Sequence, residues 1–300
     1  MFPYIILVSV LTPILADLSN ITVDVLFCSS EDYQVENLKD INIKDLTHYS
    51  NISVISSVKV IEKDDIPLLP FLLHLNFIDV ELEDIEPGCF RNLVKLKTLR
   101  LHRNNLVKIR TKTFDGIRTL KTLDLYRNHI VEIEDEAFVN LPSLLSIDLS
   151  YNKLTAIKPG WFFRCDKLRD MAISGNELTE IPSGLFRNIK SVTNLDLNFN
   201  KIRSISETAF SDLKMLDTLW LANNKIDMIP DKTFHGLKKL DFIYLDENRL
   251  VCLSDNVLKT LTDVYLVNLV ENKINNDCKH VLNEFKSKHP SVDINYENRE

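Results

Sequence analysis

The stretch LDLYRNHIVEIEDEAF, Leu123–Phe138, decides the fold. A segment twenty-four residues upstream, residues 99–114, reads LRLHRNNLVKIRTKTF, and one twenty-four residues downstream, residues 147–162, reads IDLSYNKLTAIKPGWF. The apolar positions and one asparagine recur, whereas the residues between them change. A fixed period of this length predicts a repeat architecture in which similar coils stack into one elongated unit.

One asparagine marks the same position of every copy. The asparagines recur every twenty-four residues without an insertion or deletion, at Asn104, Asn128, Asn152, Asn176, Asn200, Asn224, Asn248 and Asn272. A degenerate copy precedes them, with Val80 in place of the asparagine, and a weaker one starts near Asn51. The apolar pair before each asparagine, such as Leu123 and Leu125, has the period-two spacing of a strand. Stacked copies therefore predict a parallel sheet, with the asparagine amides forming a hydrogen-bonded ladder to backbone groups at the turns.

The pattern LxxLxLxxNxLxxIxxxxFxxL, over roughly residues 75–274, resembles the extracellular, twenty-four-residue type of leucine-rich repeat. The resemblance implies an α/β solenoid: a leucine-rich repeat horseshoe with a parallel sheet on its concave face, a mostly irregular convex side and capped ends. Within the family the arrangement is similar to insect secreted leucine-rich immune proteins and to Toll-type and chaoptin-type ectodomains. It lacks the C-terminal coiled coil and adjacent cysteine pair of the long immune members, so their partners are not carried over.

The chain divides into a signal peptide (1–16), an N-terminal cap region (17–57), the leucine-rich repeat solenoid (58–274) and a C-terminal cap (275–300). The apolar stretch 5–15, followed by Ala16, is typical of a secretory signal, and the alternative is a buried element of the fold. No other segment approaches ~18 continuous apolar residues, so we expect a secreted, extracellular protein without membrane insertion. Asn20 and Asn51 are glycosylation sequons. Both precede the regular ladder, so glycans there are expected to leave the concave face uncovered.

The five cysteines can be placed on the repeat grid. Cys89 and Cys165 fall at or beside core positions, three repeats apart, and are expected to be buried thiols. Cys252 and Cys278 follow the asparagines of consecutive repeats in positions without a core role, so stacking predicts a disulfide between them. Cys28 is left over, either as a site in the N-terminal cap or as an exposed thiol for an intermolecular disulfide.

A short helix is predicted after the last repeat, in CKHVLNEFKSKHP. It is expected to place Val281, Leu282 and Phe285 over the open end of the core and to stop at Pro290. A solenoid needs a terminal cap of this kind for solubility.

The residues four, two and one before each asparagine are expected to point outward from the concave strands. The side chains best suited to anchor a partner there are aromatic or charged: Arg100, His102, Arg103, Tyr126, Arg127, Tyr151, Phe199, Trp220, Tyr244 and Asp246. The face is basic at its N-terminal end and acidic at its C-terminal end. Tyr151 and Phe199 could equally pack on neighbouring strands, and convex or lateral surfaces of solenoids also bind.

The formal net charge of -7 argues against a general nucleic-acid or membrane-surface binder. The sequence has no HExxH, GxSxG or paired CxxC motif and no glycine-rich phosphate loop, so we expect no enzyme, cofactor or metal site. We predict a secreted, non-catalytic recognition protein whose concave surface binds another macromolecule, expected to be a protein. The resemblance implies a role in innate immunity or extracellular signalling. The alternatives are a structural protein of the extracellular matrix or cell adhesion, and an enzyme inhibitor.

Overall fold

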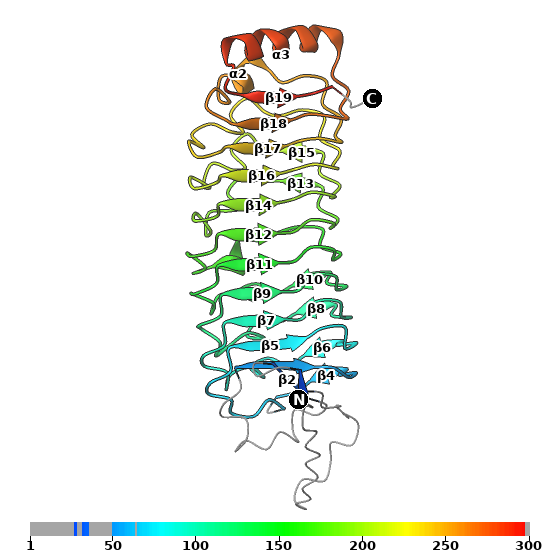
Figure 1. The fold of residues 1–300 in the computed structure, drawn as a ribbon, viewed down its shortest axis with the longest axis vertical. Coiled ribbons are helices and arrows are strands. Elements are labelled where there is room, and N and C mark those ends of the chain that lie inside the picture. The colour runs from blue at the N-terminus through cyan, green and yellow to red at the C-terminus, as the bar shows by residue number, and fades with distance from the viewer. Residues whose placement is uncertain (1–26, 29–31, 36–49, 64, 298–300) are drawn as a thin grey trace, which may run out of the picture.

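The computed structural model describes residues 27–28, 32–35, 50–63 and 65–297. Successive coils stack along one axis, and each contributes a strand to a continuous sheet on one face (Figure 1). This main sheet has 13 strands, in the order β1 (Phe27–Cys28), β2 (Asp32–Val35), β3 (Asn51–Val54), β5 (His74–Phe77), β7 (Thr98–Arg100), β9 (Thr122–Asp124), β11 (Ser146–Asp148), β12 (Asp170–Ala172), β14 (Asn194–Asp196), β16 (Thr218–Trp220), β17 (Phe242–Tyr244), β18 (Leu266–Asn268) and β19 (Asp293–Asn295).

The nine strands from β5 to β18 are those of the repeats, and they pair in parallel as the periodicity predicts. Between β9 and β11 the register joins Leu123 to Ile147. Four more strands extend the sheet at its ends. β2 and β3 continue it in parallel before the repeats, β1 pairs antiparallel with β2, and β19 follows β18. The sheet therefore begins before residue 58 and ends after residue 274.

The core lies behind this sheet, where apolar residues in and just after each strand point inward. The strand leucines Leu123 and Leu125 are fully buried. Behind them runs a column of phenylalanine rings, in which Phe138 stacks between Phe114 at 5.8 Å and Phe162 at 5.4 Å. These rings fill the space that a short, mostly non-helical back side would otherwise leave empty.

The predicted asparagine ladder is present. Asn128 donates from Nδ2 to the carbonyl oxygens of Leu101 and Leu125, both at 3.0 Å, and its Oδ1 accepts from the Leu106 N–H at 3.2 Å. One side chain thus joins its own coil to the preceding one, and the same bonds recur in the other asparagine-bearing copies. In the degenerate copy the N–H of Val80 donates to Oδ1 of Asn104, the first rung of the ladder.

The back side carries only short elements. Three two-stranded sheets join neighbouring coils: β4 (Val60–Ile61) with β6 (Asp84–Ile85), β8 (Lys108–Ile109) with β10 (Glu132–Ile133), and β13 (Glu180–Ile181) with β15 (Ser204–Ile205). One 3-10 turn spans Pro159–Phe162, and helix α2 spans Asp255–Leu258. The convex side is therefore mostly irregular, as expected.

The C-terminal cap consists of helix α3 (Asn276–Lys288) and strand β19. The Asn275 side chain accepts from the N–H of Cys278 and caps the helix N-terminus. Leu282 and Phe285 are buried as predicted, and Val281 packs against the core but is only partly buried. Its burial is partial because the inward stripe of the helix runs through residues 278, 282 and 285. The helix ends at Lys288, two residues before Pro290.

The disulfide between Cys252 and Cys278 is present, with a Cα–Cα distance of 5.3 Å. It ties the cap helix to the last coils. Cys89 and Cys165 are free and buried, as predicted. Burial raises the pKa of the Cys165 thiol to about 12, so it remains protonated and unreactive at neutral pH. Cys28 lies in β1, but its side chain falls outside the described residues.

Candidate macromolecule-binding face

The outer face of the main sheet is built by the alternation of each strand. In β9 the buried Leu123 lies between Thr122 and Asp124, whose side chains are half-buried on the outer face. The residue six before the asparagine therefore lies on the outer face in β9 as well, in a column that the sequence prediction omitted, although Thr98 and Thr218 at this position are buried. The period-two alternation that placed the other columns would have identified it.

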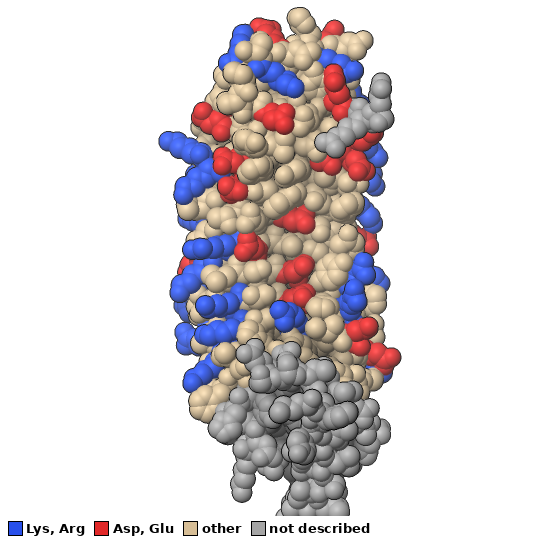
Figure 2. All heavy atoms as spheres, viewed as in Figure 1, with Lys and Arg blue, Asp and Glu red and all other residues tan. Residues whose placement is uncertain are grey.

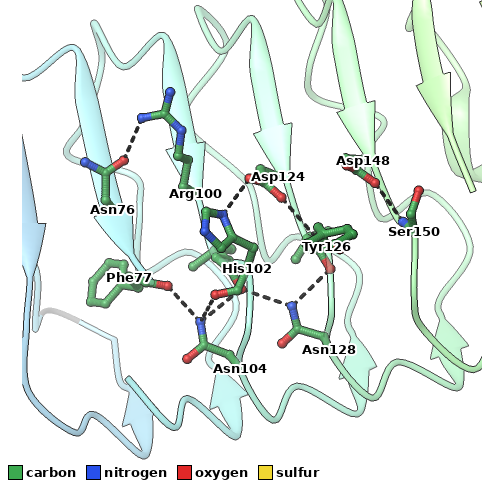
Figure 3. A network of polar contacts seen from close by, with 12 residues as sticks. Asn76, Phe77, Arg100, His102, Asn104, Asp124, Tyr126, Asn128, Asp148 and Ser150 are labelled. Carbon is green, nitrogen blue, oxygen red and sulfur yellow. Dashed lines mark hydrogen bonds and ion pairs between the residues drawn. The ribbon is translucent and has the colours of Figure 1, made fainter. Parts of the chain in front are cut away.

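Arg100 and His102, near the N-terminal end of this face, interact with neighbouring strands (Figure 3). The Arg100 guanidinium donates to Oδ1 of Asn76 at 3.2 Å. Nδ1 of His102 lies 2.6 Å from Oδ2 of Asp124. Both side chains are thus oriented by polar residues of adjacent strands.

Beside them, Tyr126, Arg127 and Tyr151 form one cluster. The two tyrosine rings meet edge to face at 5.3 Å, and the Arg127 guanidinium lies over both rings, at 5.3 and 5.6 Å. Tyr151 is 43% exposed, so it packs on its neighbours and still presents surface to a partner. Tyr151 can therefore both pack on neighbouring strands and contact a partner.

The residue directly before each asparagine has a left-handed backbone, which the sequence prediction did not identify. Arg103, Arg127, Tyr151 and Phe199 have φ values of 57, 52, 55 and 53°. Side chains other than glycine rarely adopt this conformation. Each turn supports it with an N–H bond to the next coil, such as Arg127 N–H to the Ser150 carbonyl at 2.9 Å. Gly175, at the same position with φ 64°, was the one visible signal.

Aspartates four residues before the asparagine accept backbone hydrogen bonds where the strands end. Oδ1 of Asp148 accepts from the Ser150 N–H at 2.8 Å, and Oδ1 of Asp196 accepts from the Asn198 N–H at 2.9 Å. Burial raises the pKa of both carboxyls above the ordinary value. These aspartates therefore serve the turn, which gives a physical reason for leaving them out of the binding set.

Replacing Asp148 with Asn should raise stability at neutral pH. The pKa of Asp148 is higher in the folded protein than in the unfolded chain, so its neutral carboxyl contributes stability in full below pH ~3.8. That contribution is lost as the pH rises through the folded pKa and the carboxyl ionises. Asn keeps the Oδ1 acceptor for Ser150 and carries no charge. We expect a gain of at most about 1 kcal/mol at pH 7, since the group is only half-buried, and none at pH 3. Thermal unfolding of both proteins from pH 3 to 8 measures this. A gain at pH 3 as large as that at pH 7 would contradict it.

Near the C-terminal end of the sheet the face is aromatic. The rings of Trp220 and Tyr244, on adjacent strands β16 and β17, stack at 5.9 Å with an interplanar angle of 6°. Phe242 and Tyr265 lie beside each other at 5.4 Å. Asp246 accepts from the Asn268 amide at 2.9 Å, and burial raises its pKa.

A groove of 840 Å³ adjoins this aromatic region, where the sheet meets the cap. Asp246, Glu247 and Glu271 contribute carboxylates to its wall, and Leu266 and Val270 contribute apolar surface. The opposite wall comes from α3 and β19. The repeat pattern could not reveal this groove because β19 lies outside the repeats.

The predicted residues thus form two groups and one isolated side chain. Arg100, His102, Arg103, Tyr126, Arg127 and Tyr151 share the N-terminal half of the face, and Trp220, Tyr244 and Asp246 share the C-terminal half. Phe199 lies between them and is 51% exposed. Figure 2 shows the face itself, with acidic side chains running down its middle.

The expectation that a glycan at Asn51 would leave the concave face uncovered was wrong. Strand β3 pairs with β5, with Asn51 opposite His74, so Asn51 belongs to the main sheet. It alternates with the buried Ile52, and its Oδ1 accepts from the Asn76 amide at 3.0 Å. A glycan at this position would extend from the N-terminal end of the concave face. Asn20 lies outside the described residues.

Among residues 50–63 and 65–297, no group of three or more His, Cys, Asp or Glu side chains could hold a metal ion. Within the described part of the chain, no helix has both the length and the apolar character needed to span a membrane.

The parallel sheet, the asparagine ladder and the phenylalanine column together define a leucine-rich repeat solenoid. A family model described as a BspA type leucine rich repeat region (6 copies) matches residues 83–216, 132–256 and 162–280, and the chain belongs to this family. No curated protein matches the sequence significantly.

Solved structures share the fold. The mouse RP105/MD-1 complex matches with a TM-score of 0.75 and 22% identity, over 87% of this chain and 45% of that chain. The Drosophila Toll–Spatzle complex matches with a TM-score of 0.66 and 20% identity, over 82% and 38%. The TLR13–ssRNA13 complex matches with a TM-score of 0.57 and 20% identity, over 85% and 45%. This chain therefore spans less than half the length of each, and its fold resembles that of Toll ectodomains.

Proposed function

We propose that this is a secreted, non-catalytic recognition protein whose concave face binds another protein in innate immunity or extracellular signalling. The stacked pair of Trp220 and Tyr244 carries the proposal. Large, rigid aromatic side chains anchor protein interfaces because they bury much surface and lose little rotational freedom. Neither ring belongs to the buried core, and both are half-buried on the outer face of the sheet.

The comparisons support a binding role. Each of the three similar structures is a complex with another macromolecule, namely MD-1, ssRNA13 or Spatzle. The solenoid holds its outer face on 13 paired strands, which preorganises the aromatic pair and lowers the entropy lost on binding. Secretion is supported by the apolar leader at residues 1–16.

Replacing Trp220 and Tyr244 together with Ala should weaken partner binding at least about tenfold without lowering the unfolding temperature, since two interface anchors are removed outside the core. Purified wild-type and variant proteins are immobilised and incubated with extracellular fluid from microbially challenged and unchallenged animals. Captured proteins are then quantified by mass spectrometry. We expect a partner that the wild type retains and the variant loses, and that is more abundant after challenge.

The matched control replaces Phe163 and Met228, which are 47% and 64% exposed outside the concave sheet. It should capture the partner as well as the wild type does. Equal capture by all three proteins would remove the concave pair from consideration. A partner unaffected by challenge would remove the immune role and leave the binding role in place.

A further inference from the structure

Lysine and arginine side chains gather on the flank formed by the segments that lead into the strands. We name the side chains of Lys95, Lys97, Arg118, Lys121, Lys167 and Arg169 the basic flank. Figure 2 shows this concentration along the left edge of the molecule, the side on which the strands of Figure 1 begin. All six are exposed except Lys97, which is half-buried.

The backbone stacks these cations in a line. The N–H of Lys121 donates to the Lys97 carbonyl, that of Leu145 to the Lys121 carbonyl, and that of Arg169 to the Leu145 carbonyl, each at 2.8 Å. Three of these four successive positions are therefore cationic. Coils one sheet spacing apart place Lys97 and Arg169 about 14 Å from each other along the axis.

None of the six cations of the basic flank forms an ion pair with a described carboxylate. The segments that follow the strands behave differently, because cations there pair with carboxylates of the adjacent coil. Lys59 lies 2.7 Å from Glu83, Lys108 lies 2.7 Å from Glu134, and Lys201 lies 2.8 Å from Glu177. Ion pairs thus neutralise several cations that follow the strands, whereas the six cations of the basic flank form none with a described carboxylate.

Carboxylates enter the line of Lys97, Lys121 and Arg169 toward the C-terminus, while exposed lysines continue at neighbouring positions, at Lys190, Lys214, Lys238 and Lys239. Continuing the line of Lys97, Lys121 and Arg169 toward the C-terminus, the equivalent positions are Thr193, Asp217 and Asp241. The whole chain has a formal net charge of -7. A flat anionic surface would therefore meet the carboxylates of Asp217 and Asp241 beyond Arg169, whereas a thin anionic chain could follow the lysines beside them.

We propose that the basic flank binds a sulfated polysaccharide, a second interaction that rests on the proposed extracellular location but not on the concave site. Sulfate esters are anionic at every physiological pH and suit a row of flexible lysines that act as point charges. Single-stranded nucleic acid would need open aromatic faces for base stacking. On this flank the Phe71 ring has Lys95 over its face at 4.5 Å.

The test measures binding of a heparin oligosaccharide to the full chain across a range of salt concentrations. The variant Lys95→Gln/Lys121→Gln/Lys167→Gln removes three charges from the basic flank. The control Lys153→Gln/Lys225→Gln/Lys273→Gln removes three lysines from the side that follows the strands and changes the net charge equally. We expect the flank variant to bind roughly tenfold or more weakly. Its affinity should also depend less steeply on salt concentration, because fewer charge contacts release fewer counterions on binding. The control should bind as the wild type does.

If both variants lost the same affinity for the oligosaccharide, the attraction would be to net charge alone and the proposal would be overturned. Absence of binding by the wild type at physiological salt would also overturn it. Single-stranded RNA of matched charge and vesicles with anionic lipid serve as comparators. If RNA or vesicles bound more tightly than the oligosaccharide, and the flank variant lost that binding, the polysaccharide proposal would be overturned in favour of that ligand class. The Trp220→Ala/Tyr244→Ala variant should keep full oligosaccharide binding, which separates failure of this site from failure of the concave site. Thermal unfolding confirms that all variants are folded.

Discussion

Replacing Phe138 with Ala should destabilise the solenoid by about 3–5 kcal/mol, because it removes a fully buried ring from the middle of the phenylalanine column. Phe138 contacts Phe114 in one coil and Phe162 in the next, so its loss leaves a cavity between coils that cannot close without shifting both. In a stacked repeat, stability depends on such interfaces between neighbours. Urea unfolding measures the change, with the fluorescence of buried Trp161, beside Phe162, as a local reporter.

The control is Val131→Ala in the same repeat, whose side chain is 51% exposed. It should change the free energy of unfolding by less than about 0.5 kcal/mol. If Phe138→Ala cost no more than this control, the ring column would have no role in coupling the coils.

Replacing Asn152 with Asp should cost a similar amount, about 3–5 kcal/mol at pH 7, although the two side chains have nearly the same shape. The Asn152 amide donates to the carbonyl oxygens of Leu125 and Leu149, both at 3.0 Å, while its Oδ1 accepts from the Ile130 N–H at 3.0 Å. A carboxylate cannot donate, so it would place a buried negative charge against both carbonyls.

The pH dependence distinguishes this mechanism from simple loss of packing. Burial among carbonyl oxygens should raise the folded pKa of the introduced carboxyl above its unfolded value of ~3.9. The penalty relative to wild type should therefore be smallest below that value and should grow as pH rises through the folded pKa. Asn105→Asp, at a half-buried position, is the control and should show a small penalty. A penalty for Asn152→Asp that does not change with pH would contradict the ladder's role.

The repeat itself could be predicted in detail because its interactions are local to the period. Leu123, Leu125, Asn128 and Phe138 each recur every twenty-four residues, so stacking brings like residues together regardless of curvature. The disulfide between Cys252 and Cys278 follows from the same grid. The residues outside the repeats obey no period. Strand β19, the groove beside it and the place of Asn51 on the concave sheet were accordingly not predicted.

The formal net charge, by contrast, does not show where the charges lie on the surface. A formal charge of -7 disfavours an anionic partner only when the charges are mixed over the surface. The fold separates them, since Lys108 and Lys201 lie beside carboxylates of adjacent coils while Lys121 and Arg169 do not. Which cations are neutralised depends on neighbours a full coil away, and a charge count cannot show it.

The sequence by itself determined the coil, its parallel sheet, its core and the outward columns, because a strict period makes every copy the structural context of the next. Only the tertiary structure decided which outward side chains form surfaces. Tyr126, Arg127 and Tyr151 meet because left-handed turns bring their side chains together across two coils. Trp220 and Tyr244, by contrast, lie twenty-four residues apart, so the period itself placed them side by side, and the pairing of β16 with β17 stacks their rings. Contacts between coils depend on rotamers and turn geometry, which the period leaves free.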